Sequence, residues 1–312
     1  MTAITELVTH NGKFHADEVL ASVILTRLFP NADLYRSRKA EMISPAPGRI
    51  VFDVGSVFDP ALGLFDHHQP GAPVRDCGTP YSAFGLIWRE FGHSWLSGRV
   101  SADVAEDVFA RIDKDIVSVV DAVDNGKLAP AEAGPFSGMT IFSMIENFAP
   151  GWRNDDEVDS NLAFRQACTF AQSFLDEWVR TVSMQLEADT IVRGKVAKTD
   201  GPILTLPRGM PWHGPIFEPG AEHILMVVHP RSDGCWVVST VPQEPGSYET
   251  RMDLPEAWAS LEHEALQEAS GIASAVFCHR ARFMAVVGNA ADAVAMAEEA
   301  IRIAGKEPAL SL

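Results

Sequence analysis

The 312-residue sequence contains few cysteines and no long apolar stretch. Its four cysteines are widely separated and form no Cys-x-x-Cys pair, which argues against a disulfide scaffold or a zinc ribbon and indicates a reducing compartment. No stretch reaches the roughly 18 uncharged apolar residues that a membrane span needs. The segment Met1–His10 lacks the pattern of a secretory signal peptide. We therefore expect a cytoplasmic protein without a membrane partner.

Basic side chains are also scarce, and the formal net charge is −17 at pH 7. Such a chain does not offer the broad basic surface of a protein that coats duplex nucleic acid. Residues 101–190 carry 17 acidic and 6 basic side chains, whereas residues 1–100 carry 10 and 9. A polyanionic substrate would need a local basic cluster or metal ions, and we expect such a site within residues 1–100.

Apolar residues make up 46% of the chain, which is enough for a packed core. In residues 1–190, apolar strands alternate with segments of helical spacing, which predicts an α/β domain with a parallel, doubly wound sheet. The expected strands are Leu7–His10, Asp33–Arg38, Arg49–Gly55 and Leu62–His68. The expected helices are Ala16–Phe29, Tyr81–Phe91, a long helix from Ser101 to Asp124 and a helical connector at Ser160–Ile191, with an irregular stretch at 127–160.

Residues 191–312 are expected to form a second, smaller α/β domain. Its predicted elements are strands at Ile203–Leu206, His223–His229 and Cys235–Val241, and a helix at Ala290–Ala304. In the connector, a stripe of Phe and Trp residues from Phe164 to Trp178 predicts core packing or the surface of a homodimer rather than a platform for stacked bases.

Histidine and carboxylate side chains gather at the ends of the predicted strands of the first domain. Ligands bind at the carboxyl ends of parallel strands in open sheets, so we expect these groups to converge. Imidazole and carboxylate together suit divalent transition metals such as manganese, and several around one crevice favour two ions that share a bridging carboxylate. The candidate residues are His10, His15, Asp17, Asp53, Asp66, His67, His68, Asp121 and Asp124.

Simpler roles remain open for several of these residues. Asp53 is equally compatible with a turn, because aspartate favours turns. Asp66 either contacts a metal or orients a neighbouring ligand. His67 and His68 can serve one site only if they lie on a loop, because neighbours on a strand point to opposite faces.

Two further pairs also have alternatives. Asp121 and Asp124 are expected at a helix C-terminus, where carboxylates oppose the helix dipole, and this favours a bound cation over a solvated helix end. Arg36 and Arg38 alternate along a strand and share one face. They either clamp a phosphate or form a solvated surface.

Four motifs in the first domain resemble those of the Myg family, a branch of the DHH phosphoesterase superfamily, named for its Asp-His-His motif. They are THNGKFHADEVLA (Thr9–Ala21), VFDVG (Val51–Gly55), FDHHQ (Phe65–Gln69) and DAVDNG (Asp121–Gly126). Three later runs are similar as well: WVVSTVP (Trp236–Pro242), RMDLPEAW (Arg251–Trp258) and SGIASAVFCHRARF (Ser270–Phe283). The resemblance covers nearly the whole chain in order.

The resemblance implies a DHH-type catalytic domain in residues 1–190 and a substrate-binding domain in residues 191–312. It implies a phosphoester hydrolase in which two divalent ions, Mn²⁺ or Mg²⁺, activate water; Zn²⁺ is also compatible with three histidines. Related proteins are linked to 3′–5′ exonuclease activity on RNA, so single-stranded RNA or DNA is the expected substrate. A small-molecule phosphatase or pyrophosphatase, or a metal-binding protein without turnover, are the alternatives.

The resemblance also assigns roles to individual residues. The matching metal ligands are His10, His15, Asp17, Asp53 as the bridging carboxylate, His67 and Asp124, with Asp121 as the alternative to Asp124. The superfamily more often has Asp where this chain has His15. The matching catalytic residues are His68, near the scissile phosphate, and Asp66. The expected substrate contacts are Arg36, Arg38, His279 and Arg282. The resemblance implies glycine in relatives at three positions of this region, where this chain has Arg282, Ala285 and Val286.

Overall fold

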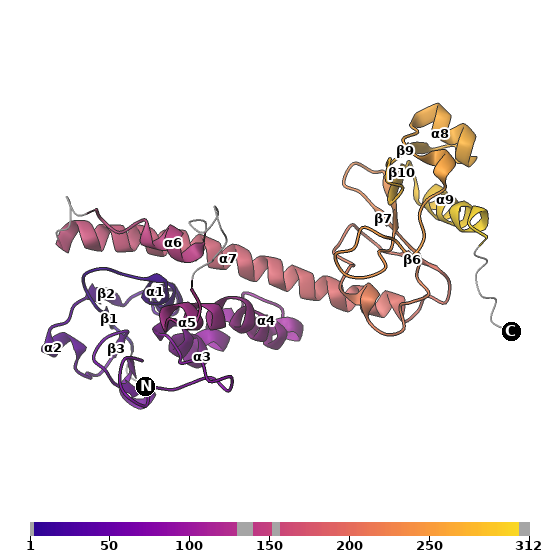
Figure 1. Ribbon diagram of the computed structural model, residues 1–312. Coiled ribbons are helices and arrows are strands. Elements are labelled where there is room, and N and C mark those ends of the chain that lie inside the picture. The colour runs from indigo at the N-terminus through magenta and orange to yellow at the C-terminus, as the bar shows by residue number, and fades with distance from the viewer. Residues whose placement is uncertain (1–2, 130–139, 152–156, 306–312) are drawn as a thin grey trace. The chain divides into compact units, whose positions relative to one another are not determined.

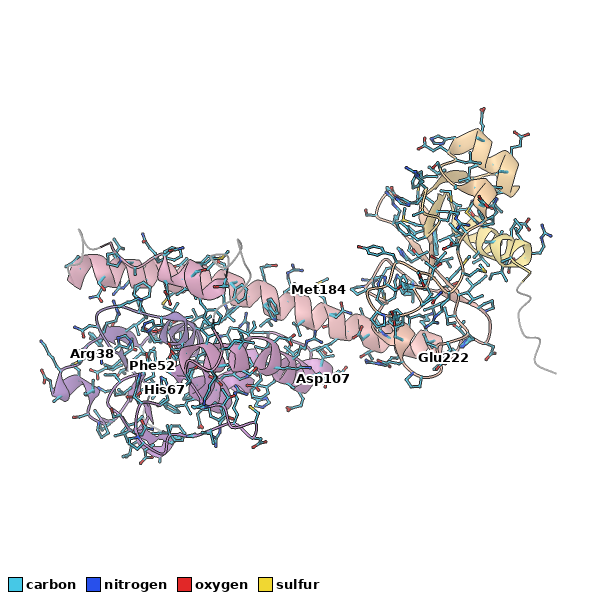
Figure 2. All side chains as sticks on the ribbon, viewed as in Figure 1. Arg38, Phe52, His67, Asp107, Met184 and Glu222 are labelled. Atoms are coloured by element: carbon cyan, nitrogen blue, oxygen red, sulfur yellow. The ribbon has the colours of Figure 1, made fainter. Side chains whose placement is uncertain are left out.

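The computed structural model describes residues 3–129, 140–151 and 157–305 (Figure 1). Contacts within the chain divide it into two compact α/β units, Met1–Met184 and Gln185–Leu312. The division falls within the 40-residue helix α7 (Glu157–Val196), directly after Met184 (Figure 2). No helix in the described ranges is long and apolar enough to cross a membrane.

The first unit is built on a five-stranded sheet. Its strands, in spatial order, are β2 (Asp33–Arg36), β1 (Glu6–Thr9), β3 (Arg49–Phe52), β5 (Leu64–Phe65) and β4 (Phe58–Asp59). The first four run parallel. β4 runs antiparallel to β5, so the prediction of a purely parallel sheet is wrong at this edge. The connection Pro60–Gly63 contains a short 3-10 turn, η1 (Pro60–Leu62), and is too short for a parallel crossover, which leaves a hairpin.

Helices α1 (Ala16–Leu28) and α3 (Ala83–Leu96) pack against each other, and α1 also contacts β1. Every residue of α1 from Ala16 to Leu25 is buried. From Val19 to Leu25 its side chains are apolar or small, as expected for an element at the centre of a unit. The short helix α2 (Ala40–Ile43) packs on the sheet through its apolar residues.

The single long helix expected from Ser101 to Asp124 is interrupted. The segments are η2 (Ala102–Val104), α4 (Ala105–Ile112), the π-helical turn η3 (Asp113–Val117) and α5 (Ser118–Asp124). The apolar pattern did not reveal the π turn, because buried residues recur every four positions from Val108 to Val120, a spacing that fits either type of helix.

Between α5 and α7, the stretch 127–160 is not wholly irregular. It contains α6 (Ile141–Glu146), which Thr140 caps, while residues 130–139 and 152–156 lie outside the described ranges. Farther along the chain, Phe164 of α7 is buried against the ring of Phe14. The beginning of the Phe and Trp stripe therefore belongs to the core.

The second unit contains a mixed five-stranded sheet. Its strands, in spatial order, are β6 (Ile203–Thr205), β7 (Met226–Pro230), β8 (Trp236–Thr240), β10 (Met284–Val287) and β9 (Ala275–Cys278). β6 pairs in parallel with β7, and the other pairs are antiparallel. The remaining elements are η5 (Pro215–Phe217), η6 (Glu256–Trp258), α8 (His263–Ser270) and α9 (Ala290–Ile303). Sequence periodicity located β6, β7, β8 and α9 but not β9, β10 or α8.

The turn between β4 and β5 depends on Gly63, which has φ 72°. A Cβ at this position would lie 2.6 Å from the backbone oxygen of Arg49. Gly63→Ala is expected to lower the free energy of unfolding by about 1–3 kcal/mol through backbone strain alone. The clash with Arg49 would also displace β3 and lower the free energy of unfolding further. Gly71→Ala is the matched control, since Gly71 has φ 76° and open space around it. Equal losses in the two variants, measured by urea denaturation, would contradict this role of the Arg49 contact.

Candidate metal centre

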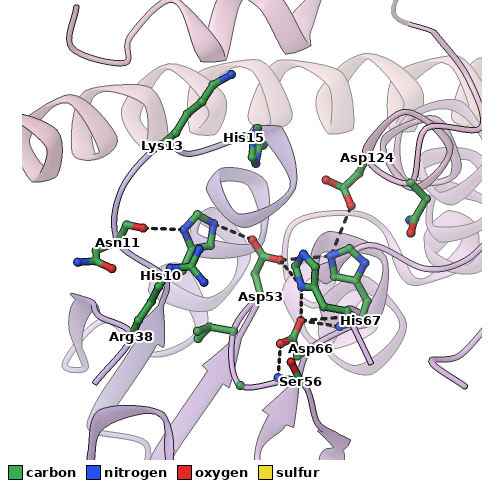
Figure 3. A pocket seen from close by; sticks show the side chains of 14 residues that line it. His10, Asn11, Lys13, His15, Arg38, Asp53, Ser56, Asp66, His67 and Asp124 are labelled. Atoms are coloured by element: carbon green, nitrogen blue, oxygen red, sulfur yellow. Dashed lines mark hydrogen bonds and ion pairs between the residues drawn. The ribbon is translucent and has the colours of Figure 1, made fainter. Parts of the chain in front are cut away.

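The polar residues that follow β1, β3 and β5 line one pocket, which the end of α5 completes (Figure 3). Its volume is about 840 Å³. This is the sheet edge at which open α/β folds bind ligands. The lining residues are His10, Asn11, Lys13, His15, Arg38, Asp53, Val54, Gly55, Ser56, Asp66, His67, His68, Asp124 and Asn125.

Asp53 lies at the centre of the pocket, between two histidines (Figure 3). Its Oδ2 is 3.1 Å from Nε2 of His10, and its Oδ1 is 3.2 Å from Nε2 of His67. Burial would raise the pKa of this carboxyl, but hydrogen bonds to both histidines outweigh burial and lower the pKa to about 2. The residue directly follows β3 with φ 57°, a left-handed conformation that aspartate tolerates better than most residues.

His10 is buried directly after β1. Its Nδ1 faces the backbone oxygen of Asn11 at 3.1 Å, while its Nε2 lies 2.9 Å from Glu18 Oε1. Burial lowers the pKa of the imidazole, but the carboxylates of Asp53 and Glu18 outweigh burial and raise the pKa to about 10. The contact with Asn11 engages Nδ1, so Nε2 is the nitrogen that can bind a metal.

Glu18 is a buried residue of the site that the sequence reasoning missed. Besides the contact of Oε1 with His10, its Oε2 accepts a hydrogen bond from the backbone N–H of His15 at 2.9 Å. His15 is the N-cap of α1, and a glutamate three residues later is one half of a capping box. The signal was present in the sequence, because Glu18 lies three positions after His15, the spacing of a capping box.

Asp17 has no hydrogen bond among the described residues, although both of its carboxylate oxygens are buried. Burial and the carboxylates of Asp53, Asp124 and Glu18 raise its pKa well above the usual value. Burial likewise raises the pKa of Asp124, whose Oδ2 lies 3.4 Å from Nε2 of His67. Three of these four carboxylates are buried and Asp124 is partly buried, and few hydrogen-bond donors face them, so a cation would satisfy the lone pairs of Asp17.

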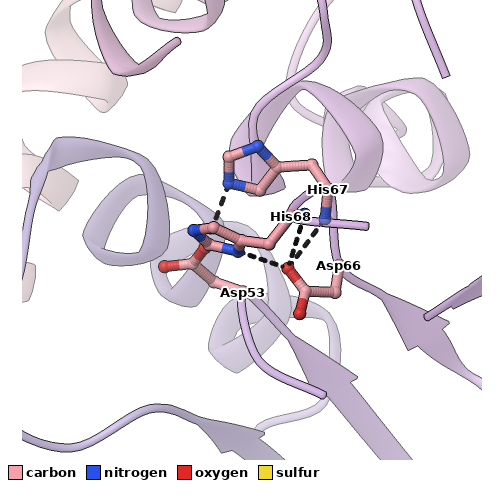
Figure 4. Close-up of side chains that lie close together, drawn as sticks. All are labelled: Asp53, Asp66, His67 and His68. Carbon is pink, nitrogen blue, oxygen red and sulfur yellow. Dashed lines mark hydrogen bonds and ion pairs between the residues drawn. The ribbon is translucent and has the colours of Figure 1, made fainter. Parts of the chain in front are cut away.

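Asp66, His67 and His68 follow β5 as a loop, which allows both imidazoles to line the pocket (Figure 4). Asp66 is buried and accepts hydrogen bonds from the backbone N–H groups of Ser56 and His67. Its Oδ1 also lies 2.7 Å from Nδ1 of His68, and this contact raises the pKa of His68. Asp66 therefore orients His68 and leaves Nε2 as the nitrogen that can meet a ligand.

Four overlapping groups of side chains each bring ligand atoms within 4.8 Å of one another. The groups are Asp53–Asp66–His67–His68, His10–His15–Glu18, Asp17–His67–Asp124 and Asp17–Glu18–Asp53. The structure thus brings together all of the expected metal ligands except Asp121, and it adds Glu18. Imidazole and carboxylate donors without a thiolate fit Mn²⁺ or Zn²⁺, and the carboxylates also fit Mg²⁺.

Arg36 does not line the pocket, in contrast to the phosphate clamp that we expected. Its side chain is buried and donates hydrogen bonds to the backbone oxygens of Gly12 and Ser160, so it fastens β2 to α7. Arg38 is exposed and lines the pocket together with Lys13. Lys13 and Arg38 thus bring cationic side chains to this pocket.

Asp121 also lies outside the pocket lining. It is fully buried, and its Oδ1 accepts hydrogen bonds from the backbone N–H and the hydroxyl of Ser82. Its Oδ2 accepts a hydrogen bond from Nε of Arg75 at 2.5 Å. The structure therefore brings Asp124, rather than Asp121, to the group of candidate ligands.

His279 and Arg282 lie after β9 in the second unit. The ring of His279 packs against Phe283 with centroids 4.3 Å apart, and Arg282 pairs with Asp253 at 2.8 Å. Arg282 has φ 61°, a conformation that glycine adopts without strain. The role of both residues toward a substrate stays a prediction.

The contacts of His10 predict how stability changes with pH in the metal-free protein. Its pKa is about 10 in the folded chain against an ordinary value of 6.5. The stability that it contributes is therefore complete below about pH 6.5 and is lost as the pH rises toward 10. Urea denaturation in a chelator is expected to show a steeper loss between pH 7 and 10 for the wild type than for His10→Gln. Parallel curves would show that His10 is not held by the carboxylates in this way.

Comparison with known proteins identifies the family. A sequence model of the MYG1_exonuc family, described as an uncharacterised protein family (UPF0160), matches residues 6–301. The MYG1 exonucleases of Rattus norvegicus and Homo sapiens are 33% and 32% identical to the chain, over 88% of it and 79% and 80% of their own lengths. A MYG1 protein of Schizosaccharomyces pombe is 30% identical over 96% of the chain and 98% of its own length. No solved structure matches. The chain belongs to the MYG1_exonuc family, as its motifs indicated.

Proposed function

We propose that the chain is a divalent-metal-dependent phosphodiesterase that shortens single-stranded RNA or DNA in the 3′–5′ direction. The observation that carries the proposal is the buried cluster of carboxylates and histidines, in which Asp17 has no hydrogen bond within the described chain. The relatives named MYG1 exonuclease support a nuclease-type function. In this proposal, residues 1–190 form a DHH-type catalytic domain and residues 191–312 bind substrate.

The donor set of the pocket fits two divalent ions, with Mn²⁺ or Mg²⁺ as the first choice and Zn²⁺ as the alternative. Asp53 is the natural shared ligand, because each of its oxygens already faces a different histidine. The proposed ligands are Asp17, Asp53, His67 and Asp124, with His10 and His15. When bound, such a pair of ions would lower the pKa of water and offset charge on the phosphoryl oxygens.

His68 is suited to meet the phosphoryl group. Its side chain is 58% exposed in the pocket, and the contact with Asp66 keeps the imidazole protonated to higher pH. Nε2 can then donate a hydrogen bond to a phosphoryl oxygen or release a proton to the leaving oxygen. Arg38 and Lys13 add positive charge to the same pocket, which attracts the phosphates of a nucleic acid strand.

A small-molecule phosphatase is the second candidate. The net charge of −17 opposes the approach of a long polyanion. Moreover, Phe164, at the start of the aromatic stripe in α7, is buried in the core and offers no surface on which a base could stack. A compact substrate such as pyrophosphate would need the metal site and the cationic side chains of the pocket alone.

The proposal is tested by turnover with added Mn²⁺ on single-stranded RNA and DNA labelled at the 5′ end, a dinucleotide and pyrophosphate. We expect stepwise shortening of the labelled strands from the 3′ end, and none in the presence of a chelator. Release of phosphate from the small compounds alone would favour the second candidate. Binding of Mn²⁺ without turnover on any of these substrates would contradict both.

Asp53→Asn is expected to reduce metal-dependent turnover by more than about 100-fold, since even the partners that only orient a metal ligand cost up to that much when removed. Asparagine tolerates the left-handed backbone of position 53, so circular dichroism is expected to show an intact fold. Wild-type turnover in this variant would contradict the role of Asp53 as the shared ligand.

His68→Gln is expected to reduce turnover by about 10²–10⁴-fold, the usual contribution of a group that transfers a proton, while the content of bound metal stays unchanged. His93→Gln is the matched control, because its side chain on α3 is 56% exposed and is not part of the pocket lining. If the variant at position 68 loses metal as readily as His67→Gln, the two histidines have been assigned the wrong roles.

A further inference from the structure

We propose that Arg75 is a positioning residue for Asp124, a role that rests on the proposed function of the metal site. Arg75 lies on the segment between β5 and α3 and is not among the residues that line the pocket. Its side chain is only 11% exposed, so the groups that it contacts are those of the protein itself. Any influence on the site must pass through those groups.

The guanidinium of Arg75 joins two parts of the interrupted helix. Nη1 and Nη2 donate hydrogen bonds to the carboxylate of Asp113 at 2.7 and 2.9 Å, and Nε donates one to Asp121 at 2.5 Å. Asp113 begins the π turn η3, and Asp121 lies on α5. The planar fork of an arginine can serve two carboxylates at once, whereas a lysine offers a single point charge.

The π turn accounts for the fact that one side chain reaches both carboxylates. Asp113 and Asp121 are eight positions apart, and eight positions of a regular α-helix rotate about 80° beyond two full turns. A π turn takes up one more residue than an α turn. With η3 between them, the spacing resembles seven positions, which lie within about 20° of two turns. The inserted residue thus returns Asp121 to the face of the helix that meets Arg75.

Asp121 is also held from the side of α3. Ser82, the N-cap of α3, donates two hydrogen bonds to Oδ1 through its backbone N–H and its hydroxyl. A Cβ added at Gly85 would lie 2.3 Å from the same oxygen, so the first turn of α3 leaves room for this carboxylate only because glycine stands there. Asp121 is therefore enclosed by Arg75, Ser82 and Gly85.

This enclosure fixes the end of α5, and Asp124 lies one turn beyond Asp121. The Oδ2 of Asp124 is 3.4 Å from Nε2 of His67, which belongs to the loop after β5. The next residue, Asn125, donates hydrogen bonds to the backbone oxygens of Pro80 and Asp121. The contacts of Arg75 thus tie α5 to the same β5–α3 segment that carries His67, and they set the distance between two proposed ligands.

The test is a titration of the full chain with Mn²⁺, in which electron paramagnetic resonance measures the free ion. The wild type is expected to bind two ions. Arg75→Gln is expected to weaken the binding of one ion by at least 10-fold, and Asp124→Asn is expected to affect the same ion. Because Arg75 acts through Asp124, the double variant is expected to lose little more than Asp124→Asn alone.

Arg89→Gln is the matched control. The guanidinium groups of Arg75 and Arg89 both lie over the ring of Tyr81, 4.8 and 5.7 Å from its centroid, but Arg89 is exposed on α3. We expect this variant to bind both ions as the wild type does. If Arg75→Gln does not fold, Asp113→Asn serves instead, since it removes the charge and one of the two acceptors that face the Nη groups and leaves the contact with Asp121 in place. It is expected to weaken the binding of the same ion by a smaller factor.

The outcomes separate the two proposals. Wild-type affinity for both ions in a folded Arg75→Gln, or additive losses in the double variant, would overturn the positioning role even if the wild type hydrolyses nucleic acid. If the wild type binds two ions and both Arg75→Gln and Asp124→Asn weaken the binding of the same one, but no phosphoester is hydrolysed, the proposed function is overturned and the positioning role stands. A wild type that binds no Mn²⁺ would overturn both.

Discussion

The feature on which this site depends is the gathering of four carboxylates at one edge of a sheet: Asp17, Glu18 and Asp53, which are buried, and Asp124, which is partly buried. Burying an ionised carboxylate is costly unless it is paired. The protein supplies part of the pairing through His10 and His67, and the N-terminus of α1 favours negative charge in the first turn of the helix. Asp17 stays without a hydrogen bond in the described chain, which fits the cation that we propose for this site.

The surrounding architecture follows from the same constraint. The parallel strands β1, β3 and β5 end at the pocket, and each is followed by one or more of the candidate ligands. Side chains that are far apart in the sequence therefore lie close together. α1 is buried throughout its first turns, which fixes the residues at its N-terminus. Asp124 comes from α5, outside the sheet, so its position depends on contacts that hold the end of α5. In the positioning role that we propose, the π turn and the contacts of Asp121 hold this helix end from outside the pocket.

The sequence predicted well those features that depend on local pattern, such as α1 and the positions of His10, Asp53 and Asp66 at the ends of β1, β3 and β5. It extended the fourth strand to His68, whereas β5 ends at Phe65 and Asp66–His68 form a loop. It failed where tertiary contacts decide. The burial of Arg36 and the pairing of Asp121 with Arg75 join residues far apart in the chain, and no spacing rule reveals them. The antiparallel β4 and the π turn were missed because each depends on one or a few residues that leave the apolar periodicity unchanged.

The most direct test of the metal site is X-ray anomalous scattering from crystals of the protein grown with Mn²⁺. The account predicts two manganese peaks in the pocket, roughly 4 Å apart, with Asp53 in contact with both and Asp17 bound to one of them. A single peak away from Asp53, or density in which Asp17 keeps its present surroundings and no ion is bound, would contradict it.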